Sequence, residues 1–249
     1  MQRELRLFFT ALAFFTRIPC ACWAGSSEDD LNHAAKYFPL AGIVVGLAGA
    51  AVYWLAHMVL PDDLAVILSM VATLWLTGAF HEDGLADAMD GLGGGWTKEQ
   101  ALTIMRDSRI GSYGAVALVM VLLAKFTALT HVSSAMFPAV LVAGHGLSRF
   151  AAVMLIRFQD YVRPIGKARP LAQHISRGEL LLAAIFGLAP LLLMQSCWLW
   201  ALLPVVLVWA WFSRKLQQRL GGYTGDCLGA MQQLCEVAFY LGVLACSSI

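Results

Sequence analysis

Seven long apolar runs restrict what this chain can fold into more than any other feature of its sequence. Each run approaches or reaches the roughly 17 to 25 residues that a helix needs to cross a bilayer. Lipid offers the backbone no hydrogen-bond partner, so each run must be helical, and an internal glycine or proline need not end it. The sequence therefore predicts an all-α, polytopic integral membrane protein, with residues 1–249 forming one membrane-embedded domain. The expected transmembrane helices cover residues 39–60, 64–80, 113–130, 134–156, 180–195, 198–213 and 228–246.

The composition agrees with this class of protein. Of the 249 residues, 59% are hydrophobic and only 13% are charged, which is about half the charged share of an ordinary soluble domain. A soluble globular enzyme is excluded, because such a chain cannot cover itself with polar surface. The formal net charge of +1 gives no sign of a nucleic-acid partner, and membrane lipid is the expected surrounding.

Lysine and arginine are distributed in a way that indicates the orientation of the chain. Only Lys125 and Arg149 of the 17 basic residues lie inside the expected spans. The others lie in the N-terminal segment, an acidic and glycine-rich loop 81–112, a basic loop 157–179 and a glycine-rich loop 214–227. The remaining turns and the C-terminus carry none. By the positive-inside rule the N-terminus and the three loops are cytoplasmic and the C-terminus is outside.

The N-terminal segment 1–38 is amphipathic, and its apolar core 7–15 is too short to span a bilayer. A cleaved signal peptide is disfavoured, because Arg17 and Pro19 follow this core directly. We expect an interfacial or re-entrant helix, and a helix packed on the other spans is an equal alternative. In the interfacial arrangement the headgroup residues are Arg3, Arg6 and Arg17, and the acyl-boundary residues are Phe8, Phe9, Phe14 and Phe15.

The stretch HEDGLADAMDGLGGG, residues 81–95, places many charges at the end of an apolar run. If the helix of residues 64–80 continues, Asp83, Asp87 and Asp90 fall at i, i+4 and i+7 and share one helical face. Like charges on neighbouring turns repel, and more strongly beside a low-dielectric bilayer, so this face requires a counter-charge. The pattern predicts a divalent cation site, with a solvated acidic loop as the alternative.

The chemistry of these side chains favours Mg²⁺ over softer metals. Carboxylates without paired histidines or clustered cysteines suit a hard ion, and Mg²⁺ completes its octahedron with water and substrate phosphate. Glu82 lies on an adjacent face and is a further candidate ligand. His81 is a candidate general base, or else it only caps the lipid boundary. The sequence thus points to phosphate chemistry.

Basic and hydroxyl side chains elsewhere are candidates for binding phosphate. Arg106 and Arg109 lie three residues apart at a helix entrance, where they suit a phosphate or a salt bridge to the acidic helix. Arg149 lies near the cytoplasmic end of its span and is expected to face the same site. Thr224 and Asp226 precede the last span among glycines, where a helix N-terminus favours an anion. Asp226 is a helix cap, a ligand or a base in this interpretation.

Charged and imidazole groups inside the spans need an explanation of their own. Lys125 and His145 each require a partner or a polar cavity within the membrane. The basic excess of loop 157–179 is explained first by topology and anionic lipid, and second by an anionic substrate.

Four stretches together resemble a known family over essentially the whole chain. They are FPLAGIVVG at 38–46, HEDGLADAMDGLGGG at 81–95, DSRIGSYG at 107–114 and GGYTGDCLGA at 221–230. They are similar to the cobalamin 5'-phosphate synthases, also called adenosylcobinamide-GDP ribazoletransferases. The resemblance implies a polytopic inner-membrane enzyme that needs Mg²⁺. It implies that adenosylcobinamide-GDP and α-ribazole 5'-phosphate, or α-ribazole, give adenosylcobalamin 5'-phosphate, or adenosylcobalamin, and GMP.

This reaction agrees with the site expected from the residues. The acidic face, helped by Glu82, would hold Mg²⁺ against the diphosphate. Asp90 or His81 would take the proton of the attacking ribose hydroxyl, and Arg106 and Arg109 would hold the phosphates. Assembly as a homo-oligomer or with other enzymes of cobalamin biosynthesis is left open.

Two functions of other classes remain as alternatives. A transporter of a cation or an anionic metabolite suits intramembrane charges and glycine-rich spans, but its ionisable groups should lie at the midplane between repeated halves. Here they gather at one edge. A membrane scaffold for other enzymes predicts that substitutions on the acidic face leave the assembled activity intact. Release of GMP from both substrates distinguishes the enzyme from these two.

Overall fold

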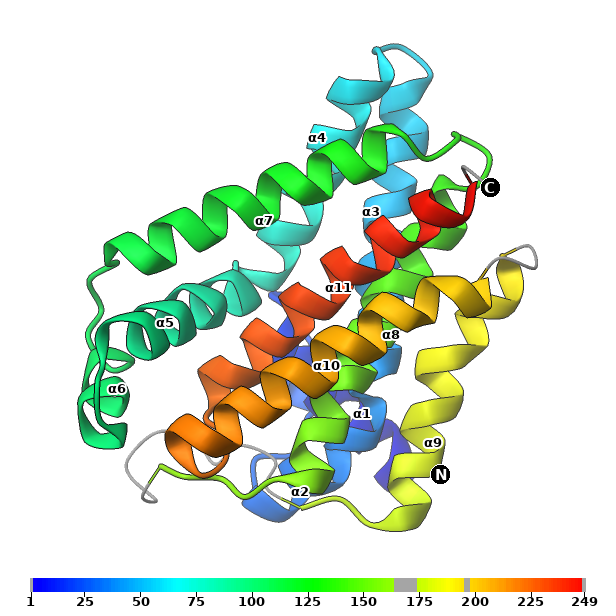
Figure 1. Ribbon diagram of the computed structural model, residues 1–249. Coiled ribbons are helices and arrows are strands. Elements are labelled where there is room, and N and C mark those ends of the chain that lie inside the picture. Colours follow the sequence, from blue (N-terminus) through cyan, green and yellow to red (C-terminus); the bar gives the residue numbers. More distant parts are fainter. Residues whose placement is uncertain (1, 164–173, 195–197, 248–249) are drawn as a thin grey trace.

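The computed structural model describes residues 2–163, 174–194 and 198–247, and the regular structure of these residues is helical (Figure 1). Each of the seven predicted spans falls on a helix, which confirms the all-α class. Among the described residues, five helices are long and apolar enough to cross a membrane, or six if α4 and α5 count as one broken span, which is fewer than the seven predicted. The helices are α1 (Gln2–Phe15), α2 (Glu28–Ala34), α3 (Phe38–His57), α4 (Asp62–Thr77), α5 (Phe80–Gly94), α6 (Lys98–Ile104), α7 (Ser112–Thr130), α8 (Phe137–Phe158), α9 (Arg177–Leu188), α10 (Trp198–Leu220) and α11 (Gly225–Ser247), with 3-10 turns at Ala21–Trp23, Ala35–Tyr37 and Ala189–Leu193.

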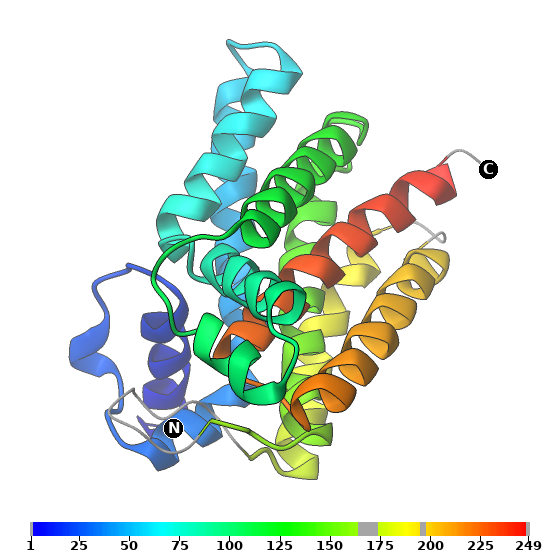
Figure 2. The same ribbon diagram turned by 60° about the vertical axis from the view of Figure 1, so that its left-hand side comes forward.

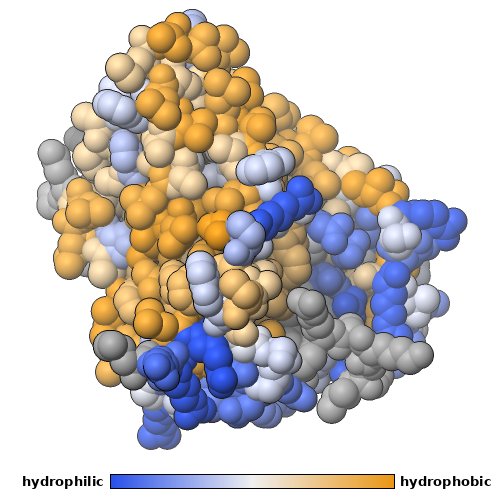
Figure 3. Space-filling model, turned by 180° about the vertical axis from the view of Figure 1, so that it is seen from behind, coloured by the Kyte–Doolittle hydropathy of each residue, from blue (hydrophilic) through white to orange (hydrophobic). Residues whose placement is uncertain are grey.

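The bundle has α8 and α11 at its centre, and most of their side chains are buried. Helix α3 packs closely on α8, because a side chain at Gly42 or Gly46 would collide with the α8 backbone. Such small residues let membrane helices approach each other. Figure 2 shows α5 lying beside the first turns of α11. Figure 3 shows apolar side chains over the upper part of one face and hydrophilic ones along its lower and right-hand edges, as expected of a membrane-embedded protein.

The chain turns sharply between α4 and α5, so the helix does not continue past Phe80 as the prediction assumed. The two helix axes differ by 84°. Gly78 and Ala79 both have positive φ angles, 66° and 56°, which end α4 in a left-handed cap. The backbone N–H of Arg17 donates to the freed carbonyl of Leu76 at 2.8 Å. The three aspartates therefore lie on one helix, but this is the separate helix α5.

Three other predicted boundaries differ from the structure. The span expected at 180–195 is α-helical only to Leu188 and continues as the 3-10 turn Ala189–Leu193, because Pro190 lacks the N–H that an α-helix needs. The loop expected at 81–112 is largely helix, and α10 continues to Leu220 into the loop expected at 214–227. Of the basic loop 157–179, residues 164–173 lie outside the described residues.

Helix α1 packs on the protein, the second of the two alternatives for the N-terminus. Leu7 is 1% exposed, and the Phe15 ring stacks on the His81 ring with their centroids 5.2 Å apart. Phe15 is therefore buried and does not reach lipid. Arg6 forms an ion pair with Asp30 of α2 at 2.8 Å.

Candidate active site

Two glycines allow α5 and α11 to cross with their backbones in contact. A Cβ at Gly84 would lie 3.0 Å from the Asp226 carbonyl oxygen, and a Cβ at Gly229 would lie 3.0 Å from the His81 carbonyl oxygen. No larger residue fits this crossing without moving a helix. The crossing brings the first turn of α11 against the acidic helix.

Three carboxylates meet across this crossing, and we call them the acidic cluster: Asp83 and Asp87 of α5 and Asp226 of α11. Asp83 is exposed, Asp87 is half-buried, and the Asp226 side chain is 19% exposed. Asp87 interacts electrostatically with both other members. Among the described residues, no three histidine, cysteine, aspartate or glutamate side chains come close enough to form a complete metal site. The cluster is a set of like charges that repel one another and are stabilised by nearby positive charge.

Arg163 supplies part of this positive charge. Its guanidinium pairs with Asp226 and also donates to the Met105 carbonyl oxygen at 3.2 Å. A short backbone pairing fixes its position, since the Tyr223 N–H donates to Asp160 at 2.9 Å and the Val162 N–H donates to Tyr223 at 3.0 Å.

The sequence reasoning explained the basic loop that contains Arg163 first by topology and anionic lipid and second by an anionic substrate, and it did not connect Arg163 with Asp226. The signal that could have found it is the glycine pair before Tyr223. Gly222 has a φ of 152°, and a side chain there would strike the Asp160 carbonyl oxygen. These glycines therefore serve the pairing that holds Arg163 next to Asp226.

Asp90 binds the start of α7 with both carboxylate oxygens, although it still interacts electrostatically with Asp87. It is 7% exposed, and its two oxygens accept the backbone N–H groups of Gly111 at 2.7 Å and Gly114 at 2.8 Å. A carboxylate at a helix N-terminus is stabilised by the unpaired N–H groups and the helix dipole. A Cβ at either glycine would collide with this carboxylate, which explains the glycine spacing in IGSYG.

Replacing Asp90 by alanine should lower the free energy of unfolding by about 2 to 3 kcal/mol, because two buried or half-buried N–H groups lose a charged acceptor. Thermal unfolding in detergent micelles measures this loss. The matched control is Asp29→Ala, whose exposed carboxylate pairs with Arg3 at 3.6 Å and with His33 at 3.4 Å, with an expected change below about 0.5 kcal/mol. Equal melting temperatures for both variants would contradict the anchoring role of Asp90.

The two arginines of the loop before α7 have separate surroundings. Arg109 is exposed and forms a bidentate pair with Asp107 of its own loop, at 2.6 Å. Its hydrogen bonds lower the pKa of Asp107 to about 2. For Arg109 the structure thus shows a salt bridge, although within its own loop and not to the acidic helix. Arg106 is exposed and interacts electrostatically with Tyr161. Tyr161 also interacts electrostatically with Arg163 and Asp226.

Thr224 and Asp226 lie at the start of α11, as predicted. Thr224 is fully buried, and its hydroxyl lies 3.4 Å from an Asp226 oxygen while accepting the backbone N–H of Cys227, also at 3.4 Å. Thr224 therefore orders the first turn of α11 and holds the Asp226 carboxylate, so its hydroxyl is not free to contact a phosphate.

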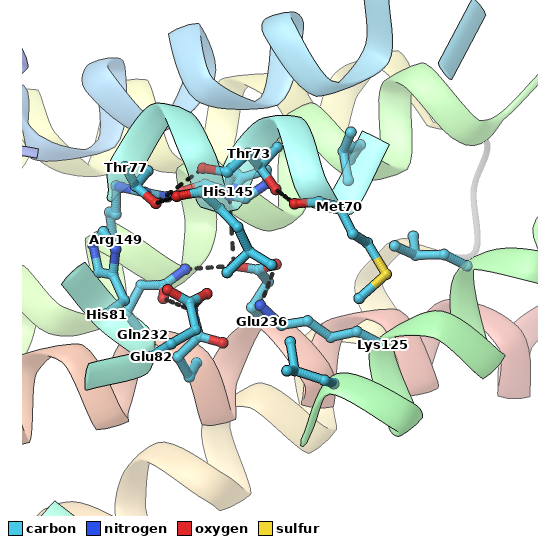
Figure 4. A pocket seen from close by; sticks show the side chains of 15 residues that line it. Met70, Thr73, Thr77, His81, Glu82, Lys125, His145, Arg149, Gln232 and Glu236 are labelled. Carbon is cyan, nitrogen blue, oxygen red and sulfur yellow. Dashed lines mark hydrogen bonds and ion pairs between the residues drawn. The ribbon is translucent and has the colours of Figure 1, made fainter. Parts of the chain in front are cut away.

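His81 and Glu82 of α5 and Arg149 of α8 lie in the interior of the bundle, apart from the acidic cluster. They line a pocket in the middle of the bundle, which we call the interior pocket (Figure 4). His81 and Arg149 are only 3% and 2% exposed. Glu82 accepts a hydrogen bond from Gln233 of α11 at 2.8 Å. The other polar residues of this pocket are Thr73, Thr77, Lys125, His145, Gln232 and Glu236.

The prediction that Lys125 and His145 need partners is confirmed, and both meet Glu236. The Lys125 Nζ atom lies 2.9 Å from Glu236, the His145 Nδ1 atom lies 3.5 Å from it, and the Tyr240 hydroxyl donates to it at 3.1 Å. The sequence reasoning missed Glu236. Its signal is the polar spacing of Gln232, Glu236 and Tyr240 at i, i+4 and i+8 within an apolar span.

Comparison with known proteins gives a consistent result over nearly the whole chain. A family model described as Cobalamin-5-phosphate synthase matches residues 7–244. The chain is 46% identical to an adenosylcobinamide-GDP ribazoletransferase of Shewanella frigidimarina, covering 98% of this chain and 95% of that protein. It is 47% and 48% identical to proteins of the same name from Ralstonia nicotianae (100% and 98% covered) and Leptothrix cholodnii (97% and 96% covered). No solved structure matches. These names describe transferases rather than transporters.

Proposed function

The chain belongs to the cobalamin-5-phosphate synthase family, and from this premise we propose that it joins adenosylcobinamide-GDP to α-ribazole 5'-phosphate, or α-ribazole, and releases GMP. The observation that carries this proposal is the acidic cluster, where Asp83 and Asp87 face Asp226 and Arg163. Phosphoryl transfer requires two anions to be positioned and their charge to be neutralised.

The acidic cluster fits a magnesium ion. Its donors are carboxylate oxygens from two helices, their mutual repulsion is only partly relieved by Arg163, and no soft ligand is among them. Mg²⁺ would neutralise charge on the diphosphate when bound. Asp87 and Asp226 would hold it, with water and the substrate phosphates completing its coordination. Both Asp90 oxygens accept backbone N–H groups and His81 is buried in the interior pocket, so Asp83, the exposed member, is our candidate to accept the proton of the attacking hydroxyl.

The remaining residues of the site bind and orient the phosphates. A ribose hydroxyl oxygen forms a bond to the phosphorus on the cobinamide side, the bond from that phosphorus to the bridging oxygen breaks, and GMP leaves. Arg163 and Arg106 lie beside the acidic cluster and Tyr161, where guanidinium groups suit phosphate oxygens. We place this site on the cytoplasmic side of the inner membrane, where the nucleotide substrates are found.

The purified protein in lipid vesicles should release GMP when it receives both substrates and Mg²⁺. Chromatography of the nucleotides, together with the corrinoid product, measures the reaction. A chelator should abolish GMP release, and added Mg²⁺ should restore it, because the carboxylates otherwise repel the diphosphate. A protein that stays folded and yet releases no GMP would count against the proposed reaction, and release that survives the chelator would count against the metal.

A further inference from the structure

The interior pocket contains an unusual concentration of polar atoms without partners. Among the described residues, the buried atoms His81 Nε2, Glu82 Oε2, Arg149 Nε and Gln233 Oε1 have no hydrogen-bond partner, and all four residues line this one pocket. Figure 4 shows His81, Glu82 and Arg149 together at one end of it. Buried polar groups in proteins are nearly always paired, so these four atoms are expected to form hydrogen bonds with a group that the described residues do not supply.

Contacts with the protein hold these side chains in place. The other oxygen of Glu82 accepts from Gln233, and a terminal nitrogen of Arg149 donates to the His145 carbonyl oxygen at 3.1 Å. The His81 ring is stacked on Phe15. Each residue thus keeps one polar atom free while its position is fixed, which is the arrangement expected of a binding site formed in advance.

The free atoms define the chemistry of the missing partner. Glu82 Oε2 and Gln233 Oε1 accept hydrogen bonds, whereas Arg149 Nε donates one. The charged groups of the pocket balance, because the carboxylates of Glu82 and Glu236 match the cations of Lys125 and Arg149. The partner is therefore uncharged and presents N–H donors beside a carbonyl oxygen.

We propose that the interior pocket binds an amide-type edge of the substrate, in which N–H donors adjoin a carbonyl oxygen. This inference rests on the proposed function, because adenosylcobinamide-GDP carries such an edge in two places, on the guanine ring and on the carboxamide side chains of the corrinoid. Glu82 is the neighbour of Asp83 in α5. One substrate can therefore engage the pocket on the inner side of α5 while its diphosphate lies at the acidic cluster.

Binding without turnover tests this assignment and uses two separate probes. The protein in lipid nanodiscs, with a chelator and without α-ribazole, is titrated with GMP and with adenosylcobinamide. Glu82→Gln replaces an acceptor by a donor, and Arg149→Lys keeps the charge but removes Nε. We expect the Kd of one probe to rise about ten-fold or more in both variants. Ser69→Ala is the control, because this buried hydroxyl donates to Gly49 at 2.9 Å and lies outside the pocket.

The outcomes identify the source of the edge. Weaker binding of GMP alone assigns the pocket to guanine, and weaker binding of adenosylcobinamide alone assigns it to a carboxamide. Unchanged binding of both probes in folded variants overturns the proposal, since ordered water would then satisfy the free atoms.

If the variants do not fold, binding of altered probes to the unaltered protein tests the proposal. IMP, which lacks one N–H donor group of GMP, or a corrinoid with one carboxamide replaced by a carboxylate should bind at least about ten-fold more weakly, and equal binding in both cases refutes the proposal. GMP release by the unaltered protein tests the proposed reaction independently.

Discussion

Replacing Asp87 by asparagine is expected to lower kcat for GMP release by about 10²- to 10³-fold. Asparagine keeps the size of the side chain but removes the charge that, with Asp226, would hold Mg²⁺ at the diphosphate. Asp87 is the half-buried member of the acidic cluster. Its interaction with the ion is thus screened less by water than that of an exposed carboxylate.

The measurement is steady-state release of GMP over a range of Mg²⁺ concentrations. Asp87→Asn should also require more Mg²⁺ for half-maximal rate, which a simple folding defect does not produce. Glu99→Gln of α6 removes an exposed carboxylate outside the acidic cluster and should leave both the rate and the Mg²⁺ requirement within about two-fold. If Asp87→Asn retains the parent rate at every Mg²⁺ concentration, the acidic cluster does not hold the metal.

Local periodicity in the sequence predicted much of the fold, but tertiary contacts decided the rest. Apolar length placed a helix at each of the seven predicted spans, because hydrocarbon forces such segments to be helical, but among the described residues only five or six helices are long and apolar enough to cross a membrane. The turn at Gly78 and Ala79 was not predictable in the same way. A positive φ at an alanine is unfavourable by itself, and Arg17, about 60 residues earlier in the chain, supports this turn through Leu76.

The candidate site was likewise predictable where it depends on local spacing and not predictable where it depends on tertiary contacts. Helical spacing correctly placed Asp83 and Asp87 on one helix, while their neighbours Asp226 and Arg163 arrive through the glycine crossing and the pairing of Tyr223 with Asp160. Asp90 follows the same spacing, yet its carboxylate accepts hydrogen bonds from the backbone N–H groups at the N-terminus of α7. A pattern on one helix cannot reveal which partner a side chain meets on another.

Adjacent residues of α5 serve different sides of the helix. Successive side chains on an α-helix are about 100° apart, so Glu82 faces Gln233 in the interior while Asp83 is exposed. The helix therefore separates an acidic cluster at the surface from a polar pocket inside a membrane bundle. Polar groups in such a place are costly, and they are retained chiefly for function.

Glu236→Ala is expected to lower the free energy of unfolding by about 3 to 5 kcal/mol, the largest effect on stability that we predict. Glu236 is 2% exposed and lies 2.9 Å from the Lys125 Nζ atom, which is itself buried. Without the carboxylate, the ammonium group of Lys125 is left unpaired beside Arg149 in a low-dielectric interior.

Thermal and chemical unfolding in micelles measure this loss, and a double variant identifies its cause. If the unpaired charge of Lys125 is responsible, Lys125→Met combined with Glu236→Leu should recover most of the stability, because replacing both members of a buried pair by apolar residues of similar volume is often neutral. A cavity left by the missing side chain predicts partial recovery from Glu236→Leu alone.

If Glu236→Ala unfolds like the parent, the ion pair of Lys125 with Glu236 contributes nothing to the stability of the bundle. If the double variant is no more stable than Glu236→Ala, the hydrogen bonds of Tyr240 and Gln232 to Glu236 matter more than the ion pair.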